Sequence, residues 1–162
     1  MNLLIEKGVK TRAFGVDFES RIKLRWFHQG VRDGRDMADV EPLLKEDGTP
    51  FKVAVLIPTI NNADELDIVL GRLAKQTYTD FEIVISDSKS KDHTKEVCDK
   101  YGVTWIDDPS RNRANACNYA LERMDHDLVL FTDDDTIPPL DWVEKLVRWF
   151  DNPEVGAVGG PN

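Results

Sequence analysis

The sequence predicts an α/β fold: a mostly parallel, doubly wound sheet with helices on both faces, preceded by an amphipathic helical N-terminal segment. Two observations lead to this prediction. From residue 51 onward, short β-branched runs alternate with stretches of helical periodicity, which is typical of parallel strands joined by crossover helices. The chain has 162 residues, of which 41% are hydrophobic and 31% charged, as in domains with a packed core. We therefore expect an extension over residues 1–50 and a domain over residues 51–162.

Five short apolar runs are the predicted strands, because strands that are buried on both faces of a parallel sheet are mostly apolar. They cover residues 53–57, 81–85, 103–106, 128–131 and 155–158. In sheets of this kind, ligands bind at the carboxyl ends of the strands. The loops that follow the strands are therefore expected to carry the chemistry.

Helical periodicity between the strands predicts three helices with one apolar face each. The faces comprise Leu66, Val69, Leu70 and Leu73, then Cys117, Ala120, Leu121 and Met124, and finally Val143, Leu146, Val147 and Phe150. Pro138 and Pro139 fit the start of the last helix, and Asn152 with Pro153 fits its end.

The N-terminal extension has a different pattern. Phe14, Phe18, Ile22 and Trp26 are spaced by four, and residues 10–35 carry seven basic and three acidic side chains. This pattern predicts an amphipathic helix, which either packs on the domain or contacts a membrane surface or a partner. Residues 43–49 are predicted to be the linker into the first strand.

Charge argues against one class of partner. The net charge of -9 lies entirely in residues 51–162, which hold 12 basic and 21 acidic side chains. Proteins that neutralise nucleic-acid phosphates need a basic surface, so we do not expect nucleic-acid binding. No secretory signal is visible, and no apolar run approaches the about 18–20 residues that span a bilayer. We expect a cytoplasmic protein, with residues 10–35 as its candidate contact with the cytoplasmic membrane surface.

Three adjacent carboxylates, Asp133, Asp134 and Asp135, follow the strand predicted over residues 128–131. Adjacent carboxylates repel one another unless a cation lies between them, and hard oxygen ligands suit Mg²⁺ or Mn²⁺. In an extended segment alternate side chains share a face, so Asp133 and Asp135 can converge on one ion. The alternative is an acidic, solvated turn that caps the next helix.

Polar groups also follow the other predicted strands. The loop after the first strand contains Thr59 and Asn61, and Asn62 or Asp64 fits the role of helix cap there. Asp87 follows the second strand and can accept from a base N–H or a ribose hydroxyl. The alternative for the later half of this segment is a plain loop with Asp92 as helix N-cap. Arg111 and Arg113 precede a predicted helix, and arginine in an acidic domain indicates an anion such as a diphosphate.

Five segments in this order and spacing resemble family 2 glycosyltransferases with the GT-A fold, a Rossmann-like architecture. The segments are VAVLIPTIN (53–61), QTYTDFE (76–82), SDSKSKDHT (86–94), ACNYAL (116–121) and FTDDDTIPPLDW (131–142). The resemblance covers residues 51–162. It implies transfer of a sugar from a nucleotide-diphosphate donor, usually with inversion, assisted by Mg²⁺ or Mn²⁺.

Carried over residue by residue, the resemblance implies that Thr59 and Asp87 contact the nucleoside and that Arg113 lies near the diphosphate. Asp133 and Asp135 would be the pair of the DxD motif, with Asp133 near the ribose and the metal. The residues expected to bind the nucleotide sugar are Pro58, Thr59, Asn61, Asp87, Arg113, Asn118, Asp133 and Asp134. The expected metal ligands are Asp133 and Asp135.

The sequence thus predicts a glycosyltransferase domain that uses a UDP- or GDP-sugar and a glycan or lipid-linked acceptor. In the family a carboxylate that acts as catalytic base comes from a later segment, which is expected beyond Asn162. We therefore expect this chain to bind donor and to transfer sugar poorly or not at all. The alternative is a non-catalytic module that binds a nucleotide sugar or a partner. A sugar nucleotidyltransferase fits less well, because no Gly-rich, Arg-bearing loop follows the first strand.

Overall fold

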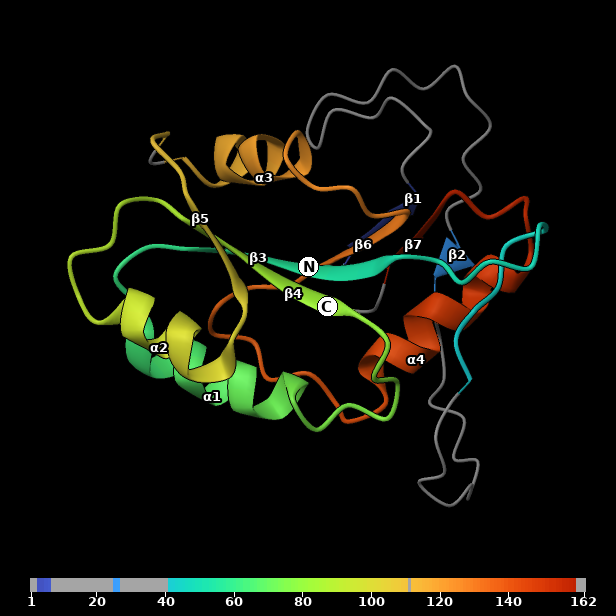
Figure 1. Cartoon of the computed structure of the whole chain (residues 1–162), viewed down its shortest axis with the longest axis horizontal. Helices are drawn as coiled ribbons and strands as arrows, with labels where there is room; N and C mark the ends of the chain where they lie inside the picture. Colours follow the sequence, from blue (N-terminus) through green and yellow to red (C-terminus); the bar gives the residue numbers. More distant parts are fainter. Residues whose placement is uncertain (1–2, 7–24, 27–40, 111, 160–162) are drawn as a thin grey trace.

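The computed structural model describes residues 3–6, 25–26, 41–110 and 112–159 (Figure 1). In this part of the chain, a seven-stranded sheet has the order β2-β7-β1-β6-β3-β4-β5. The strands are β1 (Leu3–Glu6), β2 (Arg25–Trp26), β3 (Val53–Thr59), β4 (Glu82–Asp87), β5 (Thr104–Asp107), β6 (Leu128–Phe131) and β7 (Ala157–Gly159). Four neighbouring strands, β6, β3, β4 and β5, are mutually parallel. The predicted α/β fold class is confirmed.

Helices cover both faces of the sheet (Figure 1). They are α1 (Ala63–Leu73), α2 (Thr94–Tyr101), α3 (Arg113–Leu121) and α4 (Trp142–Val147), which continues as the 3₁₀ helix η1 (Arg148–Asp151). Alternate residues of β3 divide the core, since successive side chains of a strand point to opposite faces. Val55 and Ile57 pack in the cluster of α1, α2 and α4, whereas Ala54 and Leu56 pack in the cluster of α3.

The predicted helix faces lie in these two clusters, with changes at the helix ends. All four apolar residues of the face predicted in α1 are buried. Helix α3 ends at Leu121, so Met124 is buried just beyond the helix. The last helix begins at Trp142, three residues after Pro139, and its final turn tightens so that Phe150 lies in η1. None of the helices in the described residues is long and apolar enough to cross a membrane.

The N-terminal extension contributes strands that the sequence analysis did not predict. β1 runs antiparallel between β6 and β7, with Leu4 opposite Leu130 and Val158. The helix predicted over residues 10–35 lies outside the described residues except at Arg25 and Trp26. There the prediction is wrong, because these two residues pair with Val158 and Gly159 as β2. Pairing at a sheet edge satisfies backbone groups that β7 otherwise leaves open.

The predicted linker is packed against the domain. Leu43 is buried in the core, and its N–H donates to the Tyr78 hydroxyl at 3.4 Å. The Phe51 N–H donates back to the Leu43 carbonyl at 2.9 Å, across a turn in which Gly48 has φ +81°. A glycine adopts this left-handed conformation without a Cβ clash. The segment before β3 is thereby held against Tyr78, which is fully buried.

Candidate functional site

The strand register brings the ends of three parallel strands level with one another. Thr59 pairs with Asp87, and Asp87 pairs with Asp107, at the carboxyl ends of β3, β4 and β5. On the other side of β3, Phe131 of β6 pairs with Leu56. The three carboxylates that follow β6 therefore lie at the same edge. We call this region the carboxyl edge.

Asp133, Asp134 and Asp135, here named the acidic turn, do not form the extended segment that the sequence analysis assumed. Asp134 and Asp135 lie in a turn, and the Thr136 N–H donates to the Asp133 carbonyl at 3.4 Å. The chain reverses here, so strict alternation of side chains does not extend past Asp133. Asp135 is exposed, whereas Asp133 and Asp134 are half-buried.

The acidic turn is tied to β3 by a side-chain hydrogen bond. The Thr59 hydroxyl donates to Oδ2 of Asp134 at 2.6 Å, although the two residues are 75 positions apart in the chain. Thr59 is only 4% exposed. This bond joins two of the predicted nucleotide-sugar residues and fixes the acidic turn against the end of β3.

Arg113 connects the acidic turn with α3. Its guanidinium forms an ion pair with Oδ1 of Asp133. Helix α3 begins at Arg113, and the Asn112 side chain caps it by accepting from the Asn115 N–H at 3.3 Å. The arginine predicted to lie near a diphosphate and the aspartate predicted to hold a metal are thus brought into direct contact.

Asp87 is held by its own loop and by the neighbouring strand. It is 3% exposed and accepts from the Ser90 N–H at 3.0 Å and from the Ser90 hydroxyl at 2.6 Å. Its other oxygen accepts from Nε1 of Trp105 at 3.1 Å. These bonds use three of the about four acceptor positions of an ionised carboxylate.

Hydrogen bonds of Asn61 and Asp92 connect the loops after β3 and β4. The Asn61 N–H donates to the Ser90 hydroxyl at 2.8 Å, and its side chain accepts from the Lys91 N–H at 2.7 Å. Asn61 has φ +51°, a conformation that asparagine tolerates. The backbone N–H and the side-chain oxygen of this predicted site residue therefore both hold the loop after β4.

Asp92 caps two helices, which replaces the cap expected from Asn62 or Asp64. One oxygen accepts from the Ala63 N–H at the start of α1, at 3.0 Å. The other accepts from the N–H and hydroxyl of Thr94 at the start of α2, at 3.1 and 2.6 Å. The Asn62 side chain makes no capping bond. Burial raises the pKa of Asp92, but the bonds from Thr94 and Ala63 outweigh burial and hold its pKa below the ordinary value.

Asp108 is a buried carboxylate that sequence reasoning missed. It is 0% exposed and accepts from the hydroxyls of Ser88 at 2.8 Å and Ser110 at 2.6 Å. Its second oxygen accepts from the Ser110 N–H at 3.0 Å. Asp108 thereby anchors the loop that leads to Arg113. The sequence contained a signal, because an aspartate two residues before a serine is typical of an Asx turn.

The segment after the acidic turn is held by hydrogen bonds from residues in the loop after α1. The Gln76 side chain donates to the Pro139 carbonyl at 2.6 Å and accepts from the Val143 N–H at 3.0 Å. The Thr77 N–H donates to the Leu140 carbonyl at 2.8 Å. Gln76 is 5% exposed. Gln76 and Thr77 of the QTYTDFE segment thus hold the chain that follows the acidic turn.

Two other predicted site residues lie apart from these contacts. Pro58 is a buried residue inside β3 and pairs with Ser86, so it supports the sheet. Asn118 lies in the middle of α3 and is half-buried. The side chains that the structure joins at the carboxyl edge are instead Thr59 with Asp134 and Arg113 with Asp133.

The donor set fits a divalent cation only with added ligands. Within the described residues, no group of three or more His, Cys, Asp or Glu side chains is arranged to hold a metal. Mg²⁺ and related ions are commonly held by one or two carboxylates, while phosphates and water complete the shell. The acidic turn contains carboxylates of this kind, among them Asp133 and Asp135, which the sequence analysis expected to hold a cation.

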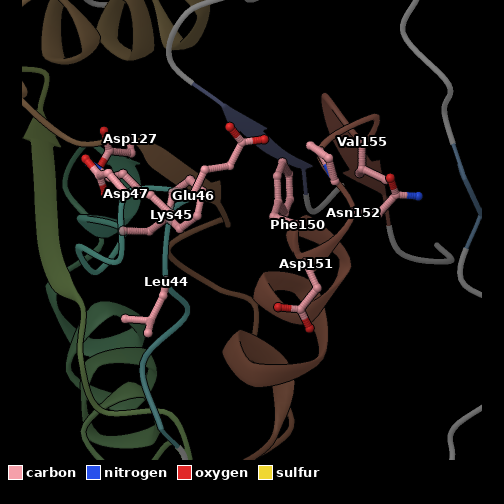
Figure 2. Close-up of a pocket in the computed structure, with 11 residues that line it drawn as sticks. Leu44, Lys45, Glu46, Asp47, Asp127, Phe150, Asp151, Asn152 and Val155 are labelled. Atoms are coloured by element: carbon pink, nitrogen blue, oxygen red, sulfur yellow. The ribbon is translucent and has the colours of Figure 1, made fainter.

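Two hollows of about 500 Å³ each lie at the opposite, amino edge of the sheet. Figure 2 shows the first, with Lys45 and Asp127 on one side and Phe150 and Val155 on the other. Lys45 and Asp127 form an ion pair at 2.7 Å. The residues joined at the carboxyl edge line neither hollow.

Similarity to known proteins identifies the family of the chain. Residues 54–162 match the sequence model of glycosyl transferase family 2. The chain is 29% identical over 119 residues to Glycosyltransferase AglE of Haloferax volcanii, covering 68% of this chain and 39% of that protein. The curated relative is therefore more than twice as long as the matched region.

Solved structures are similar to the same region. The mannosyltransferase PcManGT of Pyrobaculum calidifontis, solved with GDP-Man and Mn²⁺, has a TM-score of 0.57 and 27% identity over 64% of this chain and 33% of that one. S. aureus TarS in complex with UDP-GlcNAc has a TM-score of 0.53 and 26% identity over 62% of this chain and 31% of that one. The predicted family is confirmed, and this chain belongs to glycosyl transferase family 2.

Proposed function

We propose that the carboxyl edge binds a nucleoside-diphosphate sugar together with a divalent cation, for transfer of the sugar to a glycan or lipid-linked acceptor with inversion. The observation that carries this proposal is the convergence of Asp133, Asp134, Thr59 and Arg113. It combines hard oxygen ligands for a cation with a guanidinium for a phosphate. Inversion and the class of acceptor rest on the family alone.

Each side chain has a proposed role. Asp87 uses its remaining acceptor position for a base N–H or a ribose hydroxyl, with Thr59 beside it. Arg113 binds the diphosphate, and Asp133 and Asp135 hold the cation. When bound, the cation would stabilise the negative charge of the departing nucleoside diphosphate. The buried anchors Asp108 and Gln76 hold the loops that carry these residues.

The relatives support a nucleotide-diphosphate donor and leave its base open. PcManGT was solved with GDP-Man and Mn²⁺, and TarS with UDP-GlcNAc. Both UDP and GDP are therefore the appropriate first probes, each with Mg²⁺ and with Mn²⁺.

Isothermal titration calorimetry of the chain with UDP and GDP tests the proposal. We expect at least one nucleotide to bind, and to bind more tightly when Mn²⁺ is present. Asp135→Asn should weaken binding in the presence of Mn²⁺ by about tenfold or more, because a cation ligand is lost.

Asp125→Asn is the matched control. Asp125 is an exposed acid at the amino edge that pairs with Lys52 at 2.8 Å, and the substitution changes the net charge by the same amount. It should leave nucleotide binding unchanged. Absence of any nucleotide binding, or equal effects of both substitutions, would contradict the proposal.

A further inference from the structure

The first of the two hollows at the amino edge, here named the amino hollow, carries an excess of acids (Figure 2). Within its described lining, four side chains are acidic and Lys45 is the one basic side chain. Lys45 is paired with Asp127 at 2.7 Å, whereas three further acids of the lining are exposed, namely Glu46, Asp47 and Asp151. The amino hollow therefore attracts positive charge.

The amino hollow also offers apolar surface. Phe51, Phe150 and Val155 line it, and Leu44 of the same lining is 56% exposed. Covering apolar surface of this kind is favourable because it removes that surface from water. An occupant that carries both basic and apolar side chains would match both properties of the lining.

One segment of this chain has that composition. Residues 7–24 hold five basic and two acidic side chains, together with Phe14, Phe18 and Ile22. Their net charge of +3 is equal and opposite to the net charge of the described lining. Residues 27–40 do not match in this way, since they hold two basic and three acidic side chains.

The strand pairing places both ends of residues 7–24 at the amino edge. β1 ends at Glu6, which pairs with Leu128, the residue after Asp127 of the amino hollow. β2 begins at Arg25, which pairs with Val158 of β7. Because β1 runs antiparallel to β7 and β2 runs parallel to it, the chain leaves the sheet and enters it again at the same edge.

Residues 7–24 are much longer than the gap that they bridge. β7 alone separates β1 from β2 in the sheet, so these two strands lie about 10 Å apart. An extended chain of 18 residues reaches about 60 Å. The segment can therefore extend over the amino hollow and return to β2 without disturbing either strand pairing.

We propose that residues 7–24 of this chain occupy the amino hollow, with basic side chains at its exposed acids and apolar side chains against Phe51 and Phe150. The proposal goes beyond the donor site, since the residues joined at the carboxyl edge line neither hollow. It decides between the alternatives that the sequence leaves open for the N-terminal extension. The basic segment packs on its own domain.

Zero-length crosslinking with a carbodiimide tests the proposal, because this reagent joins a lysine amine to a carboxylate that is in contact with it. The sample is an equal mixture of isotopically light and heavy 162-residue chains, and the crosslinked peptides are identified by mass spectrometry. We expect crosslinks that join Lys7, Lys10 or Lys23 to an exposed acid of the amino hollow, with both peptides of one isotope.

Two crosslinking results would overturn the proposal. Crosslinks between light and heavy peptides would show that a second copy of the chain supplies the occupant. Absence of any crosslink between residues 7–24 and the amino hollow would show that the segment does not lie there.

Tryptic cleavage after Arg12 gives a second readout. Glu46→Gln combined with Asp151→Asn should speed this cleavage by about two- to tenfold, because exposed ion pairs that hold the segment are lost and cleavage follows the open population. Both residues are exposed, so the variant is expected to fold.

The matched control is Glu65→Gln combined with Glu96→Gln. These are exposed acids of α1 and α2 that line neither hollow, and their loss changes the net charge by the same amount. The control should be cleaved after Arg12 at the rate of the unchanged chain. Equal rates in the two double variants would contradict the proposal.

Discussion

Both edges of the sheet are rich in carboxylates, but the carboxylates at the two edges have different kinds of partner. At the amino edge, acids meet basic side chains: Asp127 pairs with Lys45 at 2.7 Å, and Asp125 pairs with Lys52 at 2.8 Å. At the carboxyl edge, two acids also pair with basic side chains, but others are held by uncharged donors. Asp87 accepts from a serine and a tryptophan, and Asp108 accepts from two serines.

This difference separates acids that are paired with lysine side chains from acids that are held by uncharged donors. Neutral donors orient a carboxylate without adding a compensating charge, whereas the lysines at the amino edge add one. Paired acids at the amino edge have little charge left for a ligand. The two hollows lie at the amino edge, whereas the proposed site lies at the carboxyl edge.

The largest effect on stability is expected at Asp108. Asp108→Ala removes the acceptor of three bonds in a site with 0% exposure and leaves the hydroxyls of Ser88 and Ser110 without it. We expect a loss of about 3 kcal/mol in the free energy of unfolding, measured by urea denaturation. Ser110→Ala, which keeps the carboxylate and Ser88, should cost about 1 kcal/mol. Equal losses would show that Asp108 does not organise the loop.

Gln76→Leu should have the next largest effect and is the variant that links stability to the site. It leaves the Pro139 carbonyl and the Val143 N–H without their buried partner, at a cost of about 2 kcal/mol. Because these bonds hold the chain after the acidic turn, nucleotide affinity in the presence of Mn²⁺ should fall as well. If the folded variant binds nucleotide with unchanged affinity in calorimetry, the bonds of Gln76 do not contribute to the site.

Asp127→Asn tests the amino edge and should cost about 1 kcal/mol at neutral pH. Burial raises the pKa of Asp127, but the bonds from Lys45 and from the Lys52 N–H outweigh burial and hold its pKa below the ordinary value of 3.8. A lowered pKa in the folded state stabilises the fold above the pKa of the unfolded state. That contribution disappears as the pH falls through the folded pKa.

The difference in unfolding free energy between the unchanged chain and Asp127→Asn should therefore shrink from pH 7 to below pH 3.8, as followed by urea denaturation at each pH. Nucleotide binding at pH 7 should not change. A loss of nucleotide affinity in Asp127→Asn would contradict the proposal that the nucleotide binds at the carboxyl edge.

The smallest effect is expected for Lys52→Gln. The side chains of Lys52 and Asp125 are 62% and 98% exposed, and ion pairs of this kind contribute little. The backbone bond from the Lys52 N–H to Asp127 at 2.9 Å is kept. We expect neither a measurable shift in Tm nor a change in nucleotide binding. A clear shift in Tm would mean that exposed pairs at the amino edge do more than their geometry indicates.

Much of the fold could be predicted because its signals are local. The parallel strands are visible in the sequence as short apolar runs. The buried residues of α1 recur with helical spacing, as Leu66, Val69, Leu70 and Leu73. The two-residue strand Arg25–Trp26 could not be predicted in this way, since its pairing with Val158 and Gly159 depends on a distant segment. Leu43 was assigned to a linker for the same reason: its burial depends on Tyr78.

For the site, the polar residue types near the end of each strand are local features of the sequence: the acids after β6, Asp87 at the end of β4 and Arg113 at the start of α3. Tertiary structure alone decided which of them meet. It joined Thr59 to Asp134 and Arg113 to Asp133, gave Asp92 two helices to cap, and buried Asp108 and Gln76. Apolar runs and hydrophobic periodicity are encoded over a few neighbouring residues, which is why they can be recognised in the sequence. A hydrogen bond or ion pair between residues 75 positions apart forms only when the sheet has brought its carboxyl ends together.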